Sequence, residues 1–149
     1  MTTMTVKNSV KFPEFTFQED LSYIAERIFI PVMQQNIEDQ ISIDGSSFPD
    51  LDPKTIARKQ KNGQGDKTLI ATRDLIKSFY SAVISPKTVI VALKFNRSAI
   101  GGYLQITGIR TKQGPKFFNF FGINTQMENN AVAYMKQRIK QAIQNAGFK

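Results

Sequence analysis

Apolar residues in the first quarter of the chain are spaced like one face of a long helix, and this pattern constrains the fold more than any other. Thr16-Phe17-Gln18-Glu19 matches a capping box, in which the Thr hydroxyl and the Glu carboxylate satisfy backbone N–H groups at a helix start. We expect this helix to run through Ile37 to about Gln40, with a kink at Pro31, which lacks an N–H group. The apolar face consists of Leu21, Ile24, Ala25, Ile28, Phe29 and Val32.

A second amphipathic helix is expected at the other end of the chain. Thr125-Gln126-Met127-Glu128 is another capping box, and Gly147 is suited to end the helix in a left-handed conformation. The apolar face of this helix is formed by Met127, Ala131, Tyr134, Met135, Ile139, Ala142 and Ile143.

The middle of the chain is expected to contain short elements. Residues 41–52 read as a loop, and Asp52-Pro53 opens a short basic helix that ends near Asn62-Gly63. Thr72 is expected to cap a second short helix that contains Leu75, Ile76 and Phe79.

Two strands follow, Phe79 to Ser85 and Thr88 to Phe95, joined around Pro86-Lys87, because apolar residues alternate there. Residues 96–102 read as a loop, and Tyr103 to Ile106 fit either a strand or a helix. The order of helices and strands lacks regular β–α alternation. It predicts an α+β fold, with a long N-terminal helix and a C-terminal helix packed on a small antiparallel β-sheet, and an extended loop and short helices between them.

The length of 149 residues suits a single domain. We expect residues 1–15 to form an extended arm, because Pro13 interrupts a stretch without helical period, and residues 16–149 to form a globular body. The first 17 residues lack the apolar core of a cleavable signal peptide. No apolar run approaches the roughly 20 residues of a membrane helix, so no membrane partner is expected.

The chain contains neither histidine nor cysteine. This excludes thiolate metal sites, disulfides and nucleophiles activated by histidine, and it removes the usual general base. The glycines at 63 and 65 and at 101 and 102 lack the spacing of phosphate-binding loops. We therefore expect no enzyme activity, no cofactor and no metal. An enzyme that uses carboxylates alone is the least favoured alternative.

The net charge of +8, with a pI near 9.8, raises the attraction for polyanions such as DNA, although a basic surface that only maintains solubility is the slightly favoured interpretation. The short basic helix supplies the candidate DNA-facing patch, and a solvated helix face is its alternative reading. No base-reading motif accompanies the patch, so any DNA contact would be nonspecific and electrostatic. The patch consists of Lys54, Arg58, Lys59 and Lys61.

Four phenylalanines near the C-terminal helix are the most unusual local feature. Adjacent side chains of an extended segment point to opposite faces, so the four cannot easily enter one core. Some are expected to fill the core, and a subunit interface would cover the others. The apolar residues of the 41–52 loop raise the same question, and the N-terminal arm is a further candidate for subunit contacts. The candidate interface residues are Ile43, Phe48, Leu51, Phe117, Phe118, Phe120 and Phe121.

Several short motifs occur in a recognisable order. Ile43-Asp44-Gly45 precedes the segment from Phe48 to Thr55, and Leu69 to Ser78 follows, with Arg73 where glycine is usual. The segments Tyr103 to Gly108, which lacks a customary histidine, and Lys116 to Ile123 complete the series. Over roughly residues 17–146 this order resembles the phage virion morphogenesis family, which includes Mu-like tail-completion proteins and related neck proteins.

The resemblance implies a structural virion protein at the head–tail junction of a tailed bacteriophage, as a neck, tail-completion or tail-terminator component. It implies a homo-oligomeric ring, with six subunits as the expected number, that contacts neighbouring neck and tail proteins. The expected locations are the virion and, during assembly, the host cytoplasm. A basic subunit would suit a ring through which genomic DNA passes. The alternative function is a non-catalytic, basic nucleic-acid-binding accessory protein.

Overall fold

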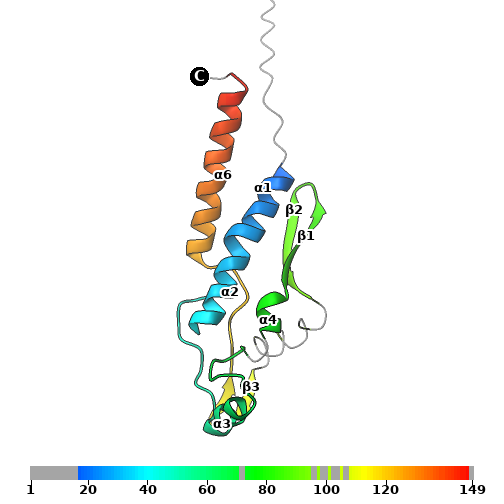
Figure 1. Cartoon of the computed structure of the whole chain (residues 1–149). Coiled ribbons are helices and arrows are strands. Elements are labelled where there is room, and N and C mark those ends of the chain that lie inside the picture. The colour runs from blue at the N-terminus through cyan, green and yellow to red at the C-terminus, as the bar shows by residue number, and fades with distance from the viewer. Residues whose placement is uncertain are drawn as a thin grey trace, which may run out of the picture.

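The long helix expected near the N-terminus forms and runs between the C-terminal helix and a β-hairpin (Figure 1). The computed structural model describes residues 17–70, 73–94, 97, 101, 105 and 108–147. The expected Thr16 cap and the 1–15 arm therefore lie outside the described residues. The helix consists of three consecutive stretches, and its C-cap is Gln40, which has a left-handed φ of 60°. They are α1 (Phe17–Tyr23), the π-helical η1 (Ile24–Phe29) and α2 (Ile30–Asp39).

The wide π-helical turn directly precedes Pro31, where a kink is expected. Pro31 has no N–H to donate, and its ring would collide with the carbonyl of Arg27 in a regular α-helix. The turn before it is wider instead, with the N–H of Ile30 donating to the carbonyl of Ala25, five residues back. The proline therefore changes the helical pitch without ending the helix.

The expected hairpin is formed by β1 (Phe79–Ser85) and β2 (Thr88–Leu93), which pair antiparallel. The register runs from Phe79 opposite Leu93 to Val83 opposite Val89, and it shifts before Ser85 opposite Thr88. Ile84 is thus the extra residue of a β-bulge near the turn. The sequence analysis placed Phe79 both in the preceding short helix and at the start of this strand; the structure places it in β1. The expected strand residue Phe95 lies outside the described part.

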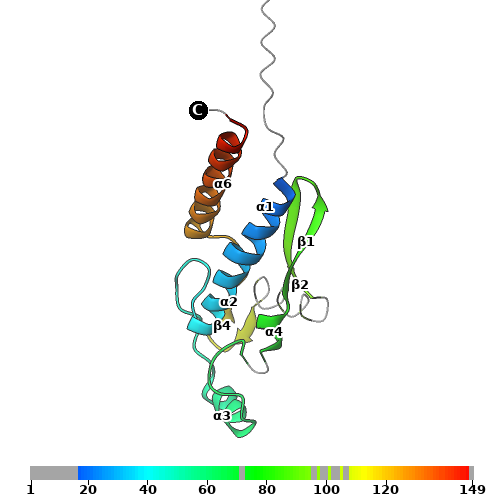
Figure 2. The same ribbon diagram turned by 45° about the horizontal axis from the view of Figure 1, so that its top comes forward.

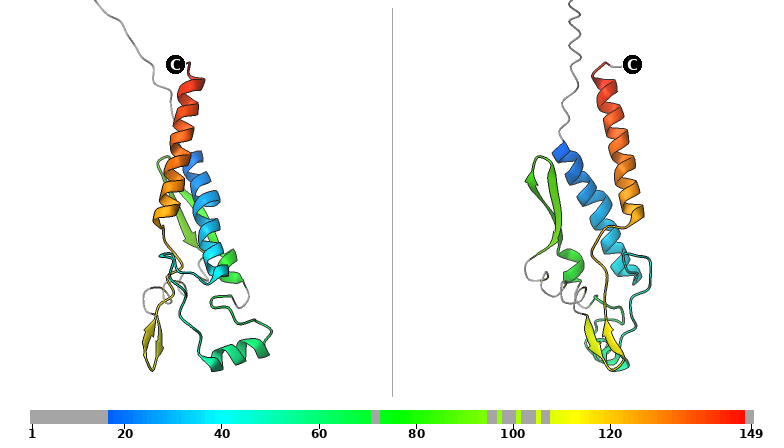
Figure 3. Two further views of the ribbon diagram at one scale, coloured as in Figure 1. Left: turned by 90° about the vertical axis from the view of Figure 1, so that its left-hand side faces the viewer. Right: turned by 180° about the vertical axis from the view of Figure 1, so that it is seen from behind.

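A second, smaller hairpin was not expected from the sequence. It consists of β3 (Ile109–Thr111) and β4 (Gly114–Lys116), which pair with each other and form a sheet separate from β1–β2. Figure 2 shows α3 (Pro53–Lys61) at the end of the molecule away from the β1–β2 turn, and in the views of Figure 3 the small hairpin lies at the same end. Gly108 precedes β3 with a φ of +72°, and a Cβ there would come within 2.8 Å of the carbonyl oxygen of Lys116.

The two short helices differ in how they begin. Helix α3 starts as expected, with the Asp52 carboxylate accepting the N–H of Lys54 at 2.8 Å. Helix α4 (Asp74–Lys77) is preceded by Arg73, which has a left-handed φ of 60° and makes no side-chain cap. The expected cap, Thr72, lies outside the described residues.

The C-terminal helix α6 (Thr125–Asn145) is capped one residue earlier than expected, by Asn124, whose side chain accepts the N–H of Met127 at 2.9 Å. The helix is attached to α1 through Asp20, which accepts hydrogen bonds from the Tyr134 hydroxyl at 3.0 Å and from Arg138 Nε at 2.9 Å. Tyr134 also stacks on Tyr23, with ring centroids 4.5 Å apart. The two helices therefore meet through polar and aromatic contacts.

The structure is mixed α+β, as the sequence predicts. The core lies where α2, α4, β1 and the segment before α6 meet. Met127 is the residue of α6 that is buried, although seven residues of its apolar face were expected to pack. The distal end of α6 extends past the start of α1 (Figure 1). The core residues are Ile30, Met33, Ile37, Ile43, Phe48, Ile70, Leu75, Ile76, Phe79, Phe118, Phe120 and Met127.

Candidate interaction surfaces

Four of the seven residues expected at a subunit interface lie in the protein's own core. Ile43 and Phe48 are buried, and so are Phe118 and Phe120. The Phe118 ring meets Phe48 edge-on at 5.9 Å between centroids, and Phe120 meets Phe79 in the same way at 6.4 Å. In this conformation the chain itself covers these four side chains and leaves them little surface for a second subunit.

The other three expected interface residues are only partly covered or exposed. Phe121 is half-buried and stacks on Phe79 at 5.9 Å, while its N–H and carbonyl both bond to the side-chain amide of Gln105. Leu51 is half-buried, and Phe117 is 47% exposed. The alternation of Phe117 outward with Phe118 and Phe120 inward follows the geometry of an extended segment. Within this segment, Phe117 remains available for a partner.

The Asp44-Gly45 turn of the 41–52 loop is held by hydrogen bonds from within the chain. The Asp44 carboxylate accepts the Ser46 hydroxyl at 2.6 Å and the Ser46 N–H at 3.0 Å, and these bonds lower the pKa of Asp44. The loop is fixed to the segment before α6, because the Ile43 N–H donates to the Asn119 carbonyl at 2.8 Å. The loop thus closes the core and holds Ile43 inside it.

The basic helix α3 presents three of its four expected cations to solvent. Lys54, Arg58 and Lys61 are exposed, whereas Lys59 is 7% exposed. The Lys59 ammonium donates to the carbonyls of Lys67 and Ile70, and burial lowers its pKa, opposed by the charge of Asp66. Lys59 therefore fastens α3 to the following loop, and its burial leaves it little surface for the predicted DNA-facing patch.

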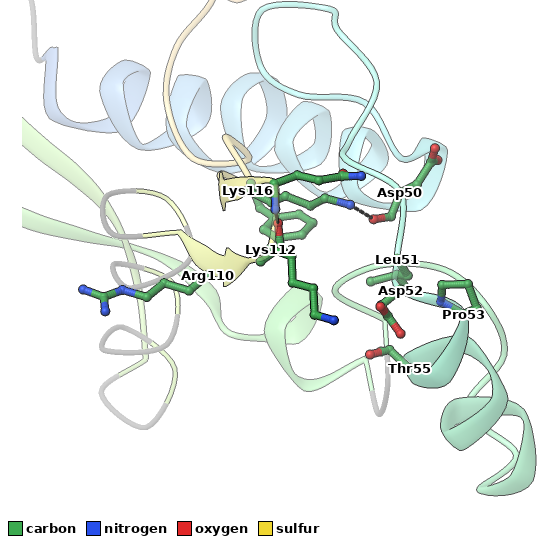
Figure 4. Close-up of a pocket in the computed structure, with 11 residues that line it drawn as sticks. Asp50, Leu51, Asp52, Pro53, Thr55, Arg110, Lys112 and Lys116 are labelled. Atoms are coloured by element: carbon green, nitrogen blue, oxygen red, sulfur yellow. Dashed lines mark hydrogen bonds between the residues drawn. The ribbon is translucent and has the colours of Figure 1, made fainter.

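Hairpin β3–β4 adds cations beside α3. Arg110 and Lys112 are exposed, and Lys116 donates to the Asp50 carbonyl at 2.7 Å across a cleft of about 650 Å³. Figure 4 shows Arg110 pointing away from the 50–55 segment. We call the exposed cations of α3 and β3–β4 the basic end; they are Lys54, Arg58, Lys61, Arg110 and Lys112.

The polar groups of this cleft already have structural partners. Asp52 caps α3, and Lys116 is held by a backbone carbonyl. The arrangement presents charge to solvent and contains no pair of groups poised for proton transfer among those whose bonds the structure describes. The cleft thus suits electrostatic contact better than chemistry. Sequence reasoning missed its β3–β4 wall, for which the signal was Arg110-Thr111-Lys112 followed closely by Gly114.

Hairpin β1–β2 exposes several large apolar side chains. Tyr80 and Ile90 are each 40% exposed, and Ile84 is 62% exposed. Neither strand contains a charged residue or a proline. Sequence reasoning predicted these strands but missed their surface, for which the signal was the absence of any polar face in the second strand, Thr88 to Leu93.

The comparisons with known proteins returned no match to a protein-family model, to a curated protein or to a solved structure. Among the described residues, none of the helices combines the length and the apolar character needed to span a bilayer. The same part of the chain contains no cluster of three or more acidic side chains suited to hold a metal ion.

Proposed function

We propose that this chain is a structural virion protein of a tailed bacteriophage, which assembles as a ring at the head–tail junction. The observation that carries the proposal is the ordered series of motifs from Ile43-Asp44-Gly45 to Phe120-Phe121-Gly122. The proposed partners are further copies of the chain, neighbouring neck and tail proteins, and genomic DNA, which the ring would contact without sequence specificity. Catalysis forms no part of the proposed role.

The backbone at two motif positions supports the resemblance. Arg73, which stands where the family has glycine, has a left-handed φ of 60°, a conformation that glycine adopts most easily. Gly45 of the Asp-Gly motif has a φ of +88°. The motif positions thus coincide with backbone geometry that would select glycine.

The distribution of charge supports a channel role. Helix α3 and hairpin β3–β4, which carry these exposed cations, lie at the end of the molecule away from the β1–β2 turn (Figures 1 and 3). A ring would repeat this end around its circumference and so multiply the attraction for a polyanion.

The test is electron microscopy of lysates from a phage in which this gene is silenced. The expected result is filled heads with unjoined or malformed tails, restored when the gene is supplied on a plasmid. Normal, infectious particles would refute the role in assembly. A plasmid copy with an early stop codon serves as the matched control, because it keeps the transcript and loses the protein.

The basic end also favours a second candidate, a nucleic-acid-binding accessory protein that acts outside the particle. Its test is the salt dependence of DNA binding by the purified chain. Tight binding by a free monomer, with normal particles after silencing, would favour this function over the virion role.

A further inference from the structure

Within the described part of the chain, hairpin β1–β2 has two unpaired edges. Its seven-residue and six-residue strands pair with each other, and no third strand joins them among the described residues. Helix α1 contacts both strands, as an element that lies against one face of the hairpin does. Each edge therefore presents a row of backbone N–H and carbonyl groups that a further strand can pair with.

Apart from the β-bulge at Ile84 near its turn, the hairpin lacks the features that keep sheet edges apart. Natural edges are commonly protected by lysine, proline or an inward charge, and neither strand contains any of these. The smaller hairpin β3–β4 has such protection, since Arg110, Pro115 and Lys116 lie within its strands. One chain thus protects one hairpin and leaves the other open.

The outward face of β1–β2 is uncharged as well. Phe79, Val91 and Leu93 pack against the core, so the alternate positions face away from it. Those positions hold Tyr80 opposite Ala92 and Ala82 opposite Ile90. Antiparallel strands with a solvated face usually carry polar residues there, and strands that are apolar on both faces usually have both covered.

We propose that the β2 edge of one copy pairs with the β1 edge of a second copy, so that neighbouring hairpins form one continuous sheet. A second copy fits because its own edge matches in length and is uncharged. The net charge of +8 makes copies repel one another over most of their surface, while the paired strands add no repulsion.

This pairing fixes the geometry of assembly. Because β1 and β2 are antiparallel, a second hairpin in the same orientation places its β1 antiparallel to the β2 it joins. All copies then share one orientation, and such head-to-tail contacts close into a ring or continue as a filament. In this respect the inference deepens the proposed function and rests on it.

The first test is the mass of the purified full-length chain in solution by light scattering. The expected result is a multiple of the 16.8 kDa chain mass that falls to 16.8 kDa in the variant Ile84→Lys with Ile90→Lys. Both residues are exposed, so the fold should survive, which circular dichroism checks. The matched control, Gln137→Lys with Gln144→Lys on α6, adds the same charge at exposed sites and should stay associated. A monomeric parent chain, an associated hairpin variant or a dissociated control would each overturn the proposal.

The second test separates edge pairing from other contacts and uses the absence of native cysteine. Ala82→Cys and Ala92→Cys variants are prepared separately and oxidised alone and mixed, with Ile90→Cys as a second choice on β2. Disulfide cross-links are expected only in the mixtures, because β1 of one copy meets β2 of another. Cross-linking of Ala82→Cys with itself would indicate a two-fold contact and refute the proposal, as would the absence of cross-links in both mixtures.

The virion role and the edge pairing of hairpins would be refuted by different experimental results. Loss of association in the hairpin variant, together with normal particles after gene silencing, would retain edge pairing and refute the virion role. Defective particles after silencing, fully restored by the hairpin variant, would retain the virion role and refute edge pairing.

Discussion

The two hairpins share a topology and differ in almost everything else. Strands β1 and β2 contain seven and six residues without a charge, whereas β3 and β4 contain three each and include Arg110 and Lys116. Hairpin β1–β2 lies along the long helix, and β3–β4 lies with α3 at one end of the molecule (Figures 1 and 3).

This difference separates two kinds of surface on one small chain. A short, charged, proline-containing hairpin resists pairing with other strands and presents cations to solvent. A longer, uncharged hairpin, whose edge protection is limited to the bulge at Ile84, offers backbone groups to a neighbour. The comparison suggests that protein contacts and polyanion contacts occupy different regions, so that substitutions in one region should leave the other function intact.

The largest effect is expected in the aromatic segment that connects β4 to α6. Phe118→Ser should reduce the free energy of unfolding by about 3–5 kcal/mol or more, because it leaves a cavity and buries a hydroxyl. Phe117→Ser, one residue away and 47% exposed, should change it by less than about 1 kcal/mol. Urea unfolding followed by circular dichroism measures both. Equal effects would mean that Phe117 is buried in solution, as it would be in an interface.

The next largest effect is expected at Lys59, the buried lysine of α3. Lys59→Met should cost about 1–3 kcal/mol of stability, because the carbonyls of Lys67 and Ile70, the latter buried, lose their donor. DNA affinity of the folded variant should stay unchanged, since Lys59 does not reach the surface. Fluorescence anisotropy with labelled duplex DNA measures the affinity. A loss of DNA affinity equal to that of Arg58→Ala would return Lys59 to the exposed patch.

A smaller effect on binding tests whether β3–β4 is the polyanion hairpin. Arg110→Ala with Lys112→Ala should lower the slope of log affinity against log salt by about 1.8, since each phosphate contact contributes about 0.9. Lys136→Ala with Lys140→Ala on α6 removes the same charge from exposed sites and serves as the control. Self-association should be unchanged in both variants. Equal losses in the two variants would show that net charge, and not the basic end, attracts DNA.

The elements that the sequence predicts well are those with long periodic patterns. The helix over residues 17–39 and the β1–β2 hairpin extend over enough residues for their periods to be read. Hairpin β3–β4 escapes this reading, because three residues per strand show no period. The shift of the α6 cap from Thr125 to Asn124 has a similar origin, because two adjacent polar residues both suit the position.

The candidate surfaces were harder to predict, because burial depends on contacts between distant segments. Phe118 and Phe48 are far apart in the sequence and meet only in the folded chain. The exclusion of Lys59 had a local signal, however. Lys54, Arg58 and Lys61 are spaced at i, i+4 and i+7 along one helix face, and Lys59 falls outside this spacing.

The smallest expected effect on stability is at Arg73, which precedes α4. Arg73 precedes α4, which leads into β1, and its left-handed backbone costs about 1–2 kcal/mol for a residue other than glycine. Its ion pair with Glu38 joins an Arg side chain that is 56% exposed, and such pairs contribute about 0–1 kcal/mol. Arg73→Gly relieves the backbone and loses the pair, so the free energy of unfolding should change by less than about 1 kcal/mol. Arg73→Val loses the pair and keeps a β-branched residue in the strained conformation, so it should be clearly less stable than Arg73→Gly in thermal unfolding. Equal destabilisation by both variants would show that the ion pair, and not the backbone, holds the start of α4 and with it the orientation of the open hairpin.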